Sequence, residues 1–427
     1  MLSRPQTSQI LALTQRKGRL LRIRAAVGDV FRNRNILLVV ITWSLFSLIE
    51  SMFLLYAPDY MRKLGGTPRT IGLLNSLVAL VSMLVMIPGG YFADKRGRKS
   101  LIVWGTFLAA FPTLLQGIAG NWRVYFVATV VGSAFSNFYL PAINALFQDS
   151  LSESTRAFTL GVVESMIHIP SIVGSFAGGY LYNKYGLTAL RCTLVANSAV
   201  YLISAGLRMG LRETLEIEVE GRASLGEALS SLISSFRGVS ESISWLKGPL
   251  ARLMVMNVLF GVHWGLTGGF WFIYALDIIG IDSFQFGLLE ASWTFLYLIL
   301  APAVGMISDR KGRIVVMRTA PIMISAFHFA FILCRGFEQA LLLWIAWAIP
   351  DALWWASWEA LWVDLVEGER RARVSMLRLV LSGLAQTASA AFSGYLYDVN
   401  PALPFFGGLI AWILVFTTFE DLRRLIS

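Results

Sequence analysis

The sequence predicts an all-α membrane protein in which twelve transmembrane helices form two similar six-helix bundles. Three observations lead to this prediction. Of the 427 residues, 56% are hydrophobic and only 15% are charged, whereas a soluble domain carries about 25% charged residues. The apolar residues come in long blocks, each near the roughly 20 residues that a helix needs to cross about 30 Å of hydrocarbon. The third observation is an internal repeat with one constant offset.

Short polar gaps separate the apolar blocks, and each block predicts one span. The predicted spans are 36–60, 70–92, 100–119, 124–146, 158–182, 187–208, 251–279, 284–307, 314–335, 339–364, 374–397 and 403–420. They divide the chain into a basic arm (1–34), an N-terminal bundle (35–209), a central linker (210–249) and a C-terminal bundle (250–427).

The distribution of Lys and Arg predicts the orientation. With the N-terminus placed inside, 29 of the 36 basic residues fall on the inner side and 7 on the outer side, so both termini are expected in the cytoplasm of a cell membrane. The arm holds eight of these residues against one acid, Asp29. It has no cleavable apolar segment and is expected to lie on anionic lipid headgroups. Because topology explains the net charge of +10, no nucleic-acid partner is expected.

The linker 210–249 opens with an acidic run from Glu213 to Glu220 and continues with apolar residues at helical spacing. This pattern predicts an amphipathic helix on the inner membrane surface. A plain tether between the halves is the alternative interpretation.

The repeat has an offset of 215 residues. The segment Gly90–Arg98 matches Gly305–Arg313, Gly179–Tyr182 matches Gly394–Tyr397, and the pair Asp149 and Arg156 matches Asp364 and Arg371. Both halves begin and end on the same side, so the repeat is parallel, with its axis along the membrane normal. Proteins of this construction bind substrate between the halves, near the midplane.

The loop after the second span resembles the signature loop of the major facilitator superfamily, and its copy follows the eighth span. The matching positions, which we expect to form a conformational latch, are Gly90, Asp94, Gly97 and Arg98 and their repeats Gly305, Asp309, Gly312 and Arg313. The glycines allow close helix approach, and each aspartate can cap a helix N-terminus of the opposite half. Each arginine is expected to pair with that aspartate. The resemblance implies a latch that closes the cytoplasmic side in the outward-open state. Positive-inside loops alone would explain the basic residues but not the paired Asp and Gly.

A second segment, Gly174–Gly179, is similar to the Gly-Pro-x-x-Gly-Gly motif of the drug/proton antiporter branch. Ser175 replaces the proline, and Pro170 is the alternative source of a kink. The arginine that these antiporters carry on their fourth helix has no counterpart, since the position reads Ala128. The resemblance is therefore partial and leaves antiport open.

Ionisable residues inside spans are costly and mark pathways for substrate or protons. The candidates for substrate or proton binding are Glu50, Glu164, His168, His263, Glu290, Asp351 and Glu359. Burial favours the neutral form of a carboxylic acid, so such acids can exchange protons. A structural pair or a water-exposed position is the alternative for each acid, and packing is the common role of a lone His.

The span 339–364 contains six tryptophans beside Asp351 and Glu359. Asp351, Trp355 and Trp358 are spaced by four and three residues and share a helix face. An aromatic wall with a carboxylate suits a lipophilic cation and would equally suit a stacked sugar. Core packing is the alternative for Trp355 and Trp358.

The resemblance implies secondary transport of a small molecule by alternating access. The leading hypothesis is proton-coupled export of amphipathic or cationic compounds by a monomer in the lipid bilayer. The alternatives are import or facilitated passage of a nutrient such as a sugar or organic ion, and a receptor of the same fold that transports nothing. We expect no enzyme, cofactor or metal site, because the sequence shows no nucleotide-binding loop, nucleophile–base pair or metal-ligand spacing.

Overall fold

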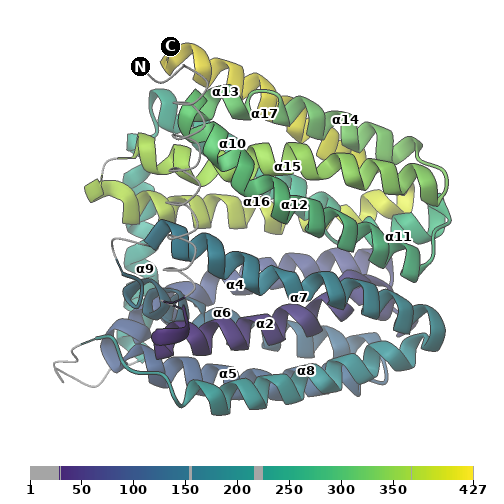
Figure 1. Cartoon of the computed structure of the whole chain (residues 1–427), viewed down its shortest axis with the longest axis horizontal. Coiled ribbons are helices and arrows are strands. Elements are labelled where there is room, and N and C mark those ends of the chain that lie inside the picture. Colours follow the sequence, from purple (N-terminus) through teal and green to yellow (C-terminus); the bar gives the residue numbers. More distant parts are fainter. Residues whose placement is uncertain (1–27, 29, 153–155, 216–224, 367, 427) are drawn as a thin grey trace, which may run out of the picture.

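The structure is a computed structural model that describes residues 28, 30–152, 156–215, 225–366 and 368–426. Most of the predicted basic arm and of the acidic run in the linker lies outside these residues. The described residues form helices and no strand, so the predicted all-α class is confirmed. The helices lie roughly parallel to one another, with the N-terminal half on one side and the C-terminal half on the other (Figure 1).

The N-terminal half contains seven helices and one 3₁₀ turn within the described ranges. They are α2 (Arg34–Phe53), η1 (Leu54–Tyr56), α3 (Ala57–Lys63), α4 (Pro68–Arg96), α5 (Arg98–Gly117), α6 (Trp122–Asp149), α7 (Arg156–Tyr185) and α8 (Leu187–Arg208). Side chains at the helix starts explain several boundaries. Asn33 and Asn121 cap α2 and α6, and Thr67 forms a capping box with Thr70 at α4, which satisfies backbone N–H groups that the helix leaves unpaired.

The linker contains α9 (Leu225–Ser242) and η2 (Ile243–Trp245). The C-terminal half follows with α10 (Gly248–Thr267), α11 (Trp271–Tyr274), the π-helical η3 (Ala275–Ile279), α12 (Ser283–Lys311), α13 (Arg313–Met317), α14 (Ala320–Leu333), α15 (Phe337–Leu365), η4 (Gly368–Arg370), α16 (Arg371–Val399) and α17 (Leu403–Ile426). Asp282 caps α12 with a capping box. Its position is that of Thr67 shifted by the repeat offset of 215.

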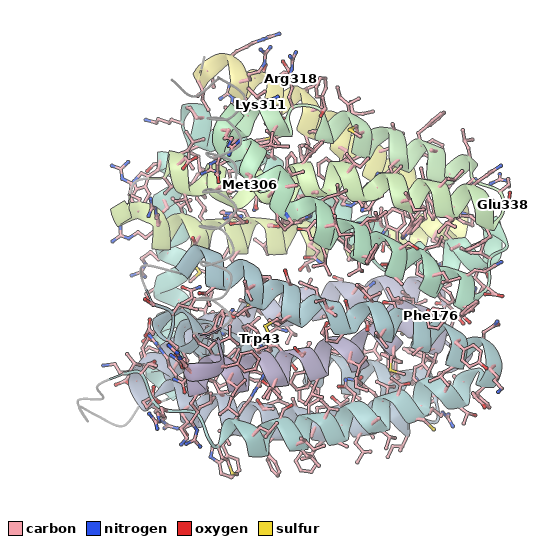
Figure 2. All side chains as sticks on the ribbon, in the orientation of Figure 1. Trp43, Phe176, Met306, Lys311, Arg318 and Glu338 are labelled. Atoms are coloured by element: carbon pink, nitrogen blue, oxygen red, sulfur yellow. The ribbon has the colours of Figure 1, made fainter. Side chains whose placement is uncertain are left out.

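Eleven helical segments within the described residues are long and apolar enough to cross a membrane. The twelfth predicted span, 374–397, falls within α16, which has 29 residues but is absent from that group. Its polar residues explain this difference, because Ser375, Arg378, Ser382 and Gln386 line a cavity between the halves. Charged side chains such as Lys311, Arg318 and Glu338 lie toward the ends of the bundle (Figure 2). The chain is therefore an integral membrane protein.

The motif end is the end at which the turns Gly97 and Gly312 connect α4 to α5 and α12 to α13; α9 lies there too (Figure 1). Both glycines adopt positive φ angles, +89° and +90°, which side chains disfavour. The opposite end contains α3, α11 and η3.

The halves pack on each other through two helix pairs, α4 with α16 and α7 with α12. A Cβ atom on Gly72 would lie 2.7 Å from the carbonyl oxygen of Ala390, and one on Gly287 would lie 2.5 Å from that of Ser175. Small residues let helices approach this closely in membranes. Gly72 and Gly287, like Ser175 and Ala390, are 215 positions apart, so the two contacts are repeats of each other.

Side chains join the halves at the opposite end. Arg62 forms an ion pair with Asp277, again 215 positions later, so these two residues are repeat counterparts that contact each other. Arg69 Nε lies 2.6 Å from Asp398 Oδ2. The Tyr56 hydroxyl donates to the Ser283 carbonyl oxygen at 3.1 Å. The opposite end is therefore closed in this structure.

Candidate functional site

A cavity of about 680 Å³ lies between the halves, lined by η1, α3, α4, α10 and α16 and by residues just after α10. Its polar lining consists of Asn75, Ser82, Asn257, Ser375, Arg378, Ser382 and Gln386. Amide, hydroxyl and guanidinium groups suit hydrogen bonding to a polar solute. None of the nine predicted substrate or proton residues belongs to this lining.

One predicted acid approaches the cavity through a partner. Glu359 on α15 accepts two hydrogen bonds from Arg378, at 3.1 and 2.7 Å. The Arg378 guanidinium also lies 4.3 Å from the ring centroid of Trp362. Arg378 is one of the 29 basic residues on the predicted inner side, and no sequence pattern pairs it with Glu359. Glu359 is thus half of an ion pair in this structure.

Two other predicted acids lie close together in the C-terminal half. Asp351 on α15 is only 7% exposed, and Glu290 on α12 lies within Coulombic range of it. The Glu290 carboxylate accepts a hydrogen bond from Trp344 Nε1 at 3.3 Å. Neither acid has an ion-pair partner among the residues that the structure describes.

Aromatic rings surround these acids. The indole N–H groups of Trp293 and Trp355 lie beside the Asp351 carboxylate, and the buried Trp293 N–H has no partner within hydrogen-bonding geometry. Trp293 stacks on Tyr297 with ring centroids 5.8 Å apart. We call the set Glu290, Trp293, Tyr297, Trp344, Asp351 and Trp355 the acid–aromatic cluster.

Sequence reasoning missed Trp293 and Tyr297. The signal was present, because Glu290, Trp293 and Tyr297 follow one another at spacings of three and four and therefore share a face of α12.

Glu164 and His168 extend the arrangement across the interface between the halves. They lie on α7, with His168 Nε2 3.4 Å from Glu164 Oε2, and both side chains are at least half exposed. Tyr297 of the acid–aromatic cluster lies within Coulombic range of both Glu164 and Asp351. The structure thus brings Glu164, Glu290 and Asp351 to one region, where α7 packs against α12.

Among the predicted latch residues, Arg98 does not lie where its expected pairing with Asp94 requires. Arg98 pairs with Asp149 and donates to Thr214 Oγ1 at 2.9 Å. Asp94 is exposed and makes no hydrogen bond or ion pair with any other described residue. The expected Arg98–Asp94 pair is therefore not formed. The turn at Gly97 explains this, because it separates the last turn of α4 from the start of α5, where Arg98 faces the end of α6.

In the second copy of the motif, Gly305–Arg313, the expected pair of arginine and aspartate is formed. Arg313 pairs with Asp364, which is the counterpart of Asp149, and also with Asp309 at 3.2 Å. No described helix of the opposite half is capped by Asp94, so the expected cap is not formed in this structure.

Comparison with known proteins decides the family. The model of the Major Facilitator Superfamily matches residues 39–267, more than half of the 427-residue chain. The chain belongs to the Major Facilitator Superfamily. Members of this superfamily carry small molecules across membranes and are not enzymes.

Individual relatives are distant. Multidrug resistance protein 2 of Bacillus subtilis is 24% identical over 48% of this chain and 50% of its own length. The quinolone resistance protein NorA of Staphylococcus aureus is 28% identical over 29% of this chain and 32% of its own length. The matches thus span half or less of these relatives. A crystal structure of a mutant of the nucleoside transporter NupG superposes with a TM-score of 0.70 at 14% identity, covering 92% of this chain and 100% of that one; this shows the fold.

The Gly174–Gly179 segment of this superfamily member is a packing surface. A Cβ atom on Gly174 would lie 2.2 Å from the Leu48 carbonyl oxygen, and one on Gly178 would lie 2.5 Å from Met52 Cα, both on α2. Gly179 instead approaches the Ser283 carbonyl oxygen of α12. The glycines therefore let one face of α7 pack against α2 of its own half and another face pack against α12 of the other half.

Three of the residues predicted to bind substrate or protons lie outside both the cavity and the acid–aromatic cluster. His263 and Trp358 are packed inside the C-terminal half, both 3% exposed. The His263 ring centroid is 4.8 Å from that of His328, and Trp358 stacks on Trp354 at 4.9 Å. Glu50 lies on α2 in the N-terminal half, half-buried and without a hydrogen bond or ion pair to any described residue. The roles predicted for these three residues stay predictions.

Replacing Asp94 tests the predicted latch. Asp94→Asn is expected to leave the melting temperature of the purified transporter unchanged, because the exposed carboxylate has no partner here, yet to slow transport by destabilising the state in which the latch closes. Asp421→Asn, at an exposed acid on α17, is the control. Thermal unfolding and initial transport rates measure the two effects. A lower melting temperature with unchanged rates would contradict the latch.

Proposed function

We propose that this transporter exports lipophilic or amphipathic cations in exchange for protons, and that the acid–aromatic cluster binds both. The observation that carries the proposal is the pair of carboxylates, Glu290 and Asp351, set among aromatic rings without a cationic side chain as partner in the described chain. A lipophilic cation supplies the missing charge and gains up to about 2 kcal/mol from each desolvated cation–π contact.

The same acids can serve as proton carriers. Burial favours the neutral form of a carboxylic acid, whereas a bound cation favours its ionised form. Arrival of the cation at Asp351 or Glu290 therefore favours release of a proton, and departure of the cation favours its uptake. This competition for one site is sufficient to exchange the two ions.

The relatives' names point in the same direction. One is a multidrug resistance protein and the other a quinolone resistance protein. At their low identity and partial coverage, these relatives support only a class of substrate, drug-like compounds. The residues of this chain support the preference for cations and the direction of transport.

We further infer that the motif end faces the cytoplasm, because the predicted orientation places 29 of 36 basic residues on that side. The structure, closed at the opposite end by Arg62 and Asp277, is then the inward-facing state of an alternating-access cycle. The disengaged Asp94 accords with that state.

A second candidate is transport of a polar solute. The cavity lined by Asn75, Asn257, Gln386 and Arg378 favours it, since these groups suit hydroxyl or carboxylate groups of a substrate. This candidate does not use the acid–aromatic cluster.

One assay separates the two candidates. The transporter is reconstituted into liposomes loaded with a pH-sensitive dye, and tetraphenylphosphonium, a lipophilic cation, is added. The proposal expects proton movement opposite to the cation, with the cation accumulating against its gradient when a pH gradient is imposed. Passage of tetraphenylphosphonium without proton movement, or no passage at all, would reject the proposal.

A further inference from the structure

The start of the central linker binds the first copy of the motif. Arg212 is held against α2 by both of its backbone groups: its N–H donates to Asn35 Oδ1 at 2.8 Å, and its carbonyl oxygen accepts from Asn35 Nδ2 at 3.0 Å. The next two residues, Glu213 and Thr214, then make side-chain contacts with the first turn of α5. The linker is therefore bound to the part of the N-terminal half that contains the predicted latch.

Glu213 caps α5. The N-cap position of this helix is Gly97, which has no side chain that could cap it. Glu213 supplies the missing group, because its Oε2 accepts a hydrogen bond from the Lys99 N–H at 2.9 Å. Its Oε1 accepts from the N–H groups of the two residues that follow it, at 3.0 and 3.3 Å. The first N–H groups of a helix have no partner within the helix, and the helix dipole favours a carboxylate beside them.

Thr214 binds the arginine of the motif directly. Its Oγ1 accepts from Arg98 Nη1 at 2.9 Å, and the same guanidinium pairs with Asp149 near the end of α6. Arg98 is only 9% exposed, so these contacts form in a low dielectric, where a hydrogen bond is stronger than in water. The arginine is thus held between α6 and the linker, and Asp94, its predicted partner, is left exposed.

The second copy of the motif shows the same arginine without such a contact. Arg313 also pairs with the acid near the end of the neighbouring helix, Asp364, but it keeps Asp309 as a second partner at 3.2 Å. Within the described residues, Arg313 makes no hydrogen bond to a threonine or to the linker. Its side chain is 25% exposed, against 10% for Arg98. Contact with the linker therefore distinguishes the arginine that lacks its aspartate from the one that keeps it.

We propose that Glu213 and Thr214 are positioning residues of the carrier, which hold Arg98 away from Asp94 while the motif end is open. When the motif end closes, Arg98 exchanges Thr214 for Asp94 and completes the latch. The linker thereby sets how readily this end closes, whatever solute is carried. The assignment of this structure to the open state of the motif end rests on the proposed function, whereas the competition of Thr214 and Asp94 for one arginine does not.

Melting temperatures of the purified full-length carrier test this competition without any substrate. Asp94→Asn alone should change nothing, and Thr214→Val alone should lower the melting temperature only slightly, because Arg98 can then turn to Asp94. The double variant should lose more than the two single variants together, because Arg98 lacks both partners. Effects that simply add would overturn the proposal.

Two further variants control the melting experiment. Thr214→Ser keeps the hydroxyl group and should melt as the wild type does, both alone and combined with Asp94→Asn. Thr417→Val, at an exposed threonine of α17, should show no coupling to Asp94→Asn. Coupling of the same size at Thr417 would overturn the proposal, because it would show that the coupling at Thr214 is not a contact with Arg98.

Distances between spin labels at Lys95 and Lys311, both exposed at the motif end, test the role in closure. In the carrier without substrate, Thr214→Val is expected to raise the ratio of closed to open molecules about tenfold, as expected for the loss of one hydrogen bond to a charged group. The shift needs Asp94 and should be absent from the Asp94→Asn carrier, whereas a merely structural effect would persist there. No shift, or one that persists without Asp94, would overturn the role in closure.

Glu213 is tested with the same labels. Glu213→Ala frees the segment that carries Thr214 and should shift the distances in the same direction, whereas Glu213→Gln keeps an acceptor for the Lys99 N–H and should shift them less. Equal distances in Glu213→Ala and the wild type would remove Glu213 from the proposal. A wild-type carrier whose motif end is already closed would reject the inward-facing state of the proposed function alone, because the melting temperatures still decide the competition for Arg98.

Discussion

Replacing Asp351 by asparagine is expected to abolish proton movement evoked by tetraphenylphosphonium and to weaken binding of this cation. Asparagine keeps the size of the side chain but removes the charge that the cation meets and the group that exchanges a proton. Loss of one partner of a buried charge pair costs about 2 kcal/mol or more, which corresponds to roughly thirtyfold in affinity. Fluorescence of the dye-loaded liposomes and a binding titration of purified protein measure the two effects.

Two variants control this experiment. Asp421→Asn removes an exposed carboxylate on α17 and should change neither quantity. Trp355→Phe keeps an aromatic face beside Asp351, so proton movement should persist with a smaller loss of affinity. If Asp351→Asn exchanges cation for protons as the wild type does, Asp351 has no part in the mechanism, and the acid–aromatic cluster is not the site.

Replacing Gly287 by leucine is expected to prevent closure of the opposite end and to stop transport. A Cβ atom there would lie 2.5 Å from the Ser175 carbonyl oxygen on α7, and backbone cannot yield as a flexible side chain does. Overpacking of this kind costs about 1–3 kcal/mol, enough to shift an equilibrium by roughly 5–150-fold. The carrier should accumulate in the state that is open at this end.

Accessibility of a cysteine to a membrane-impermeant maleimide measures this shift. With Cys192 replaced by serine, a cysteine introduced at Phe272, which is buried at the closed end, should label faster in the Gly287→Leu carrier. Gly206→Leu is the matched control, because a Cβ atom on Gly206 meets nothing within 4 Å. Equal labelling rates in both glycine variants would show that the α7–α12 contact does not hold the opposite end closed.

The order of the helices and the repeat were predictable from the sequence for a physical reason. A span needs about twenty apolar residues whatever it packs against. Each span can therefore be recognised from its own stretch of sequence. The offset of 215 found in the loops reappears in three dimensions, since Gly72 meets Ala390 as Gly287 meets Ser175. The exception is α16, whose polar residues face the cavity and lower its apolarity.

The composition of the candidate site was less predictable. Spacing tells which residues share a face of their own helix, as for Asp351 and Trp355, but the rotation of that face toward its neighbours is set by packing. Trp358 shares the predicted face and yet stacks on Trp354 inside the half. Arg208 ends the predicted span 187–208 and is one of the 29 basic residues on the predicted inner side. In the structure its long side chain extends back between the helices to Thr42 and Thr106.

The central claim is that the two halves open and close their ends in turn around the acid–aromatic cluster. Distances between spin labels test it most directly, with one pair at Lys95 and Lys311 on the motif end and another at Lys184 and Glu338 on the opposite end, all exposed. On addition of tetraphenylphosphonium or a change of pH, the account predicts that one distance distribution shortens while the other lengthens. Distances that change in the same direction at both ends, or at neither end, would contradict it.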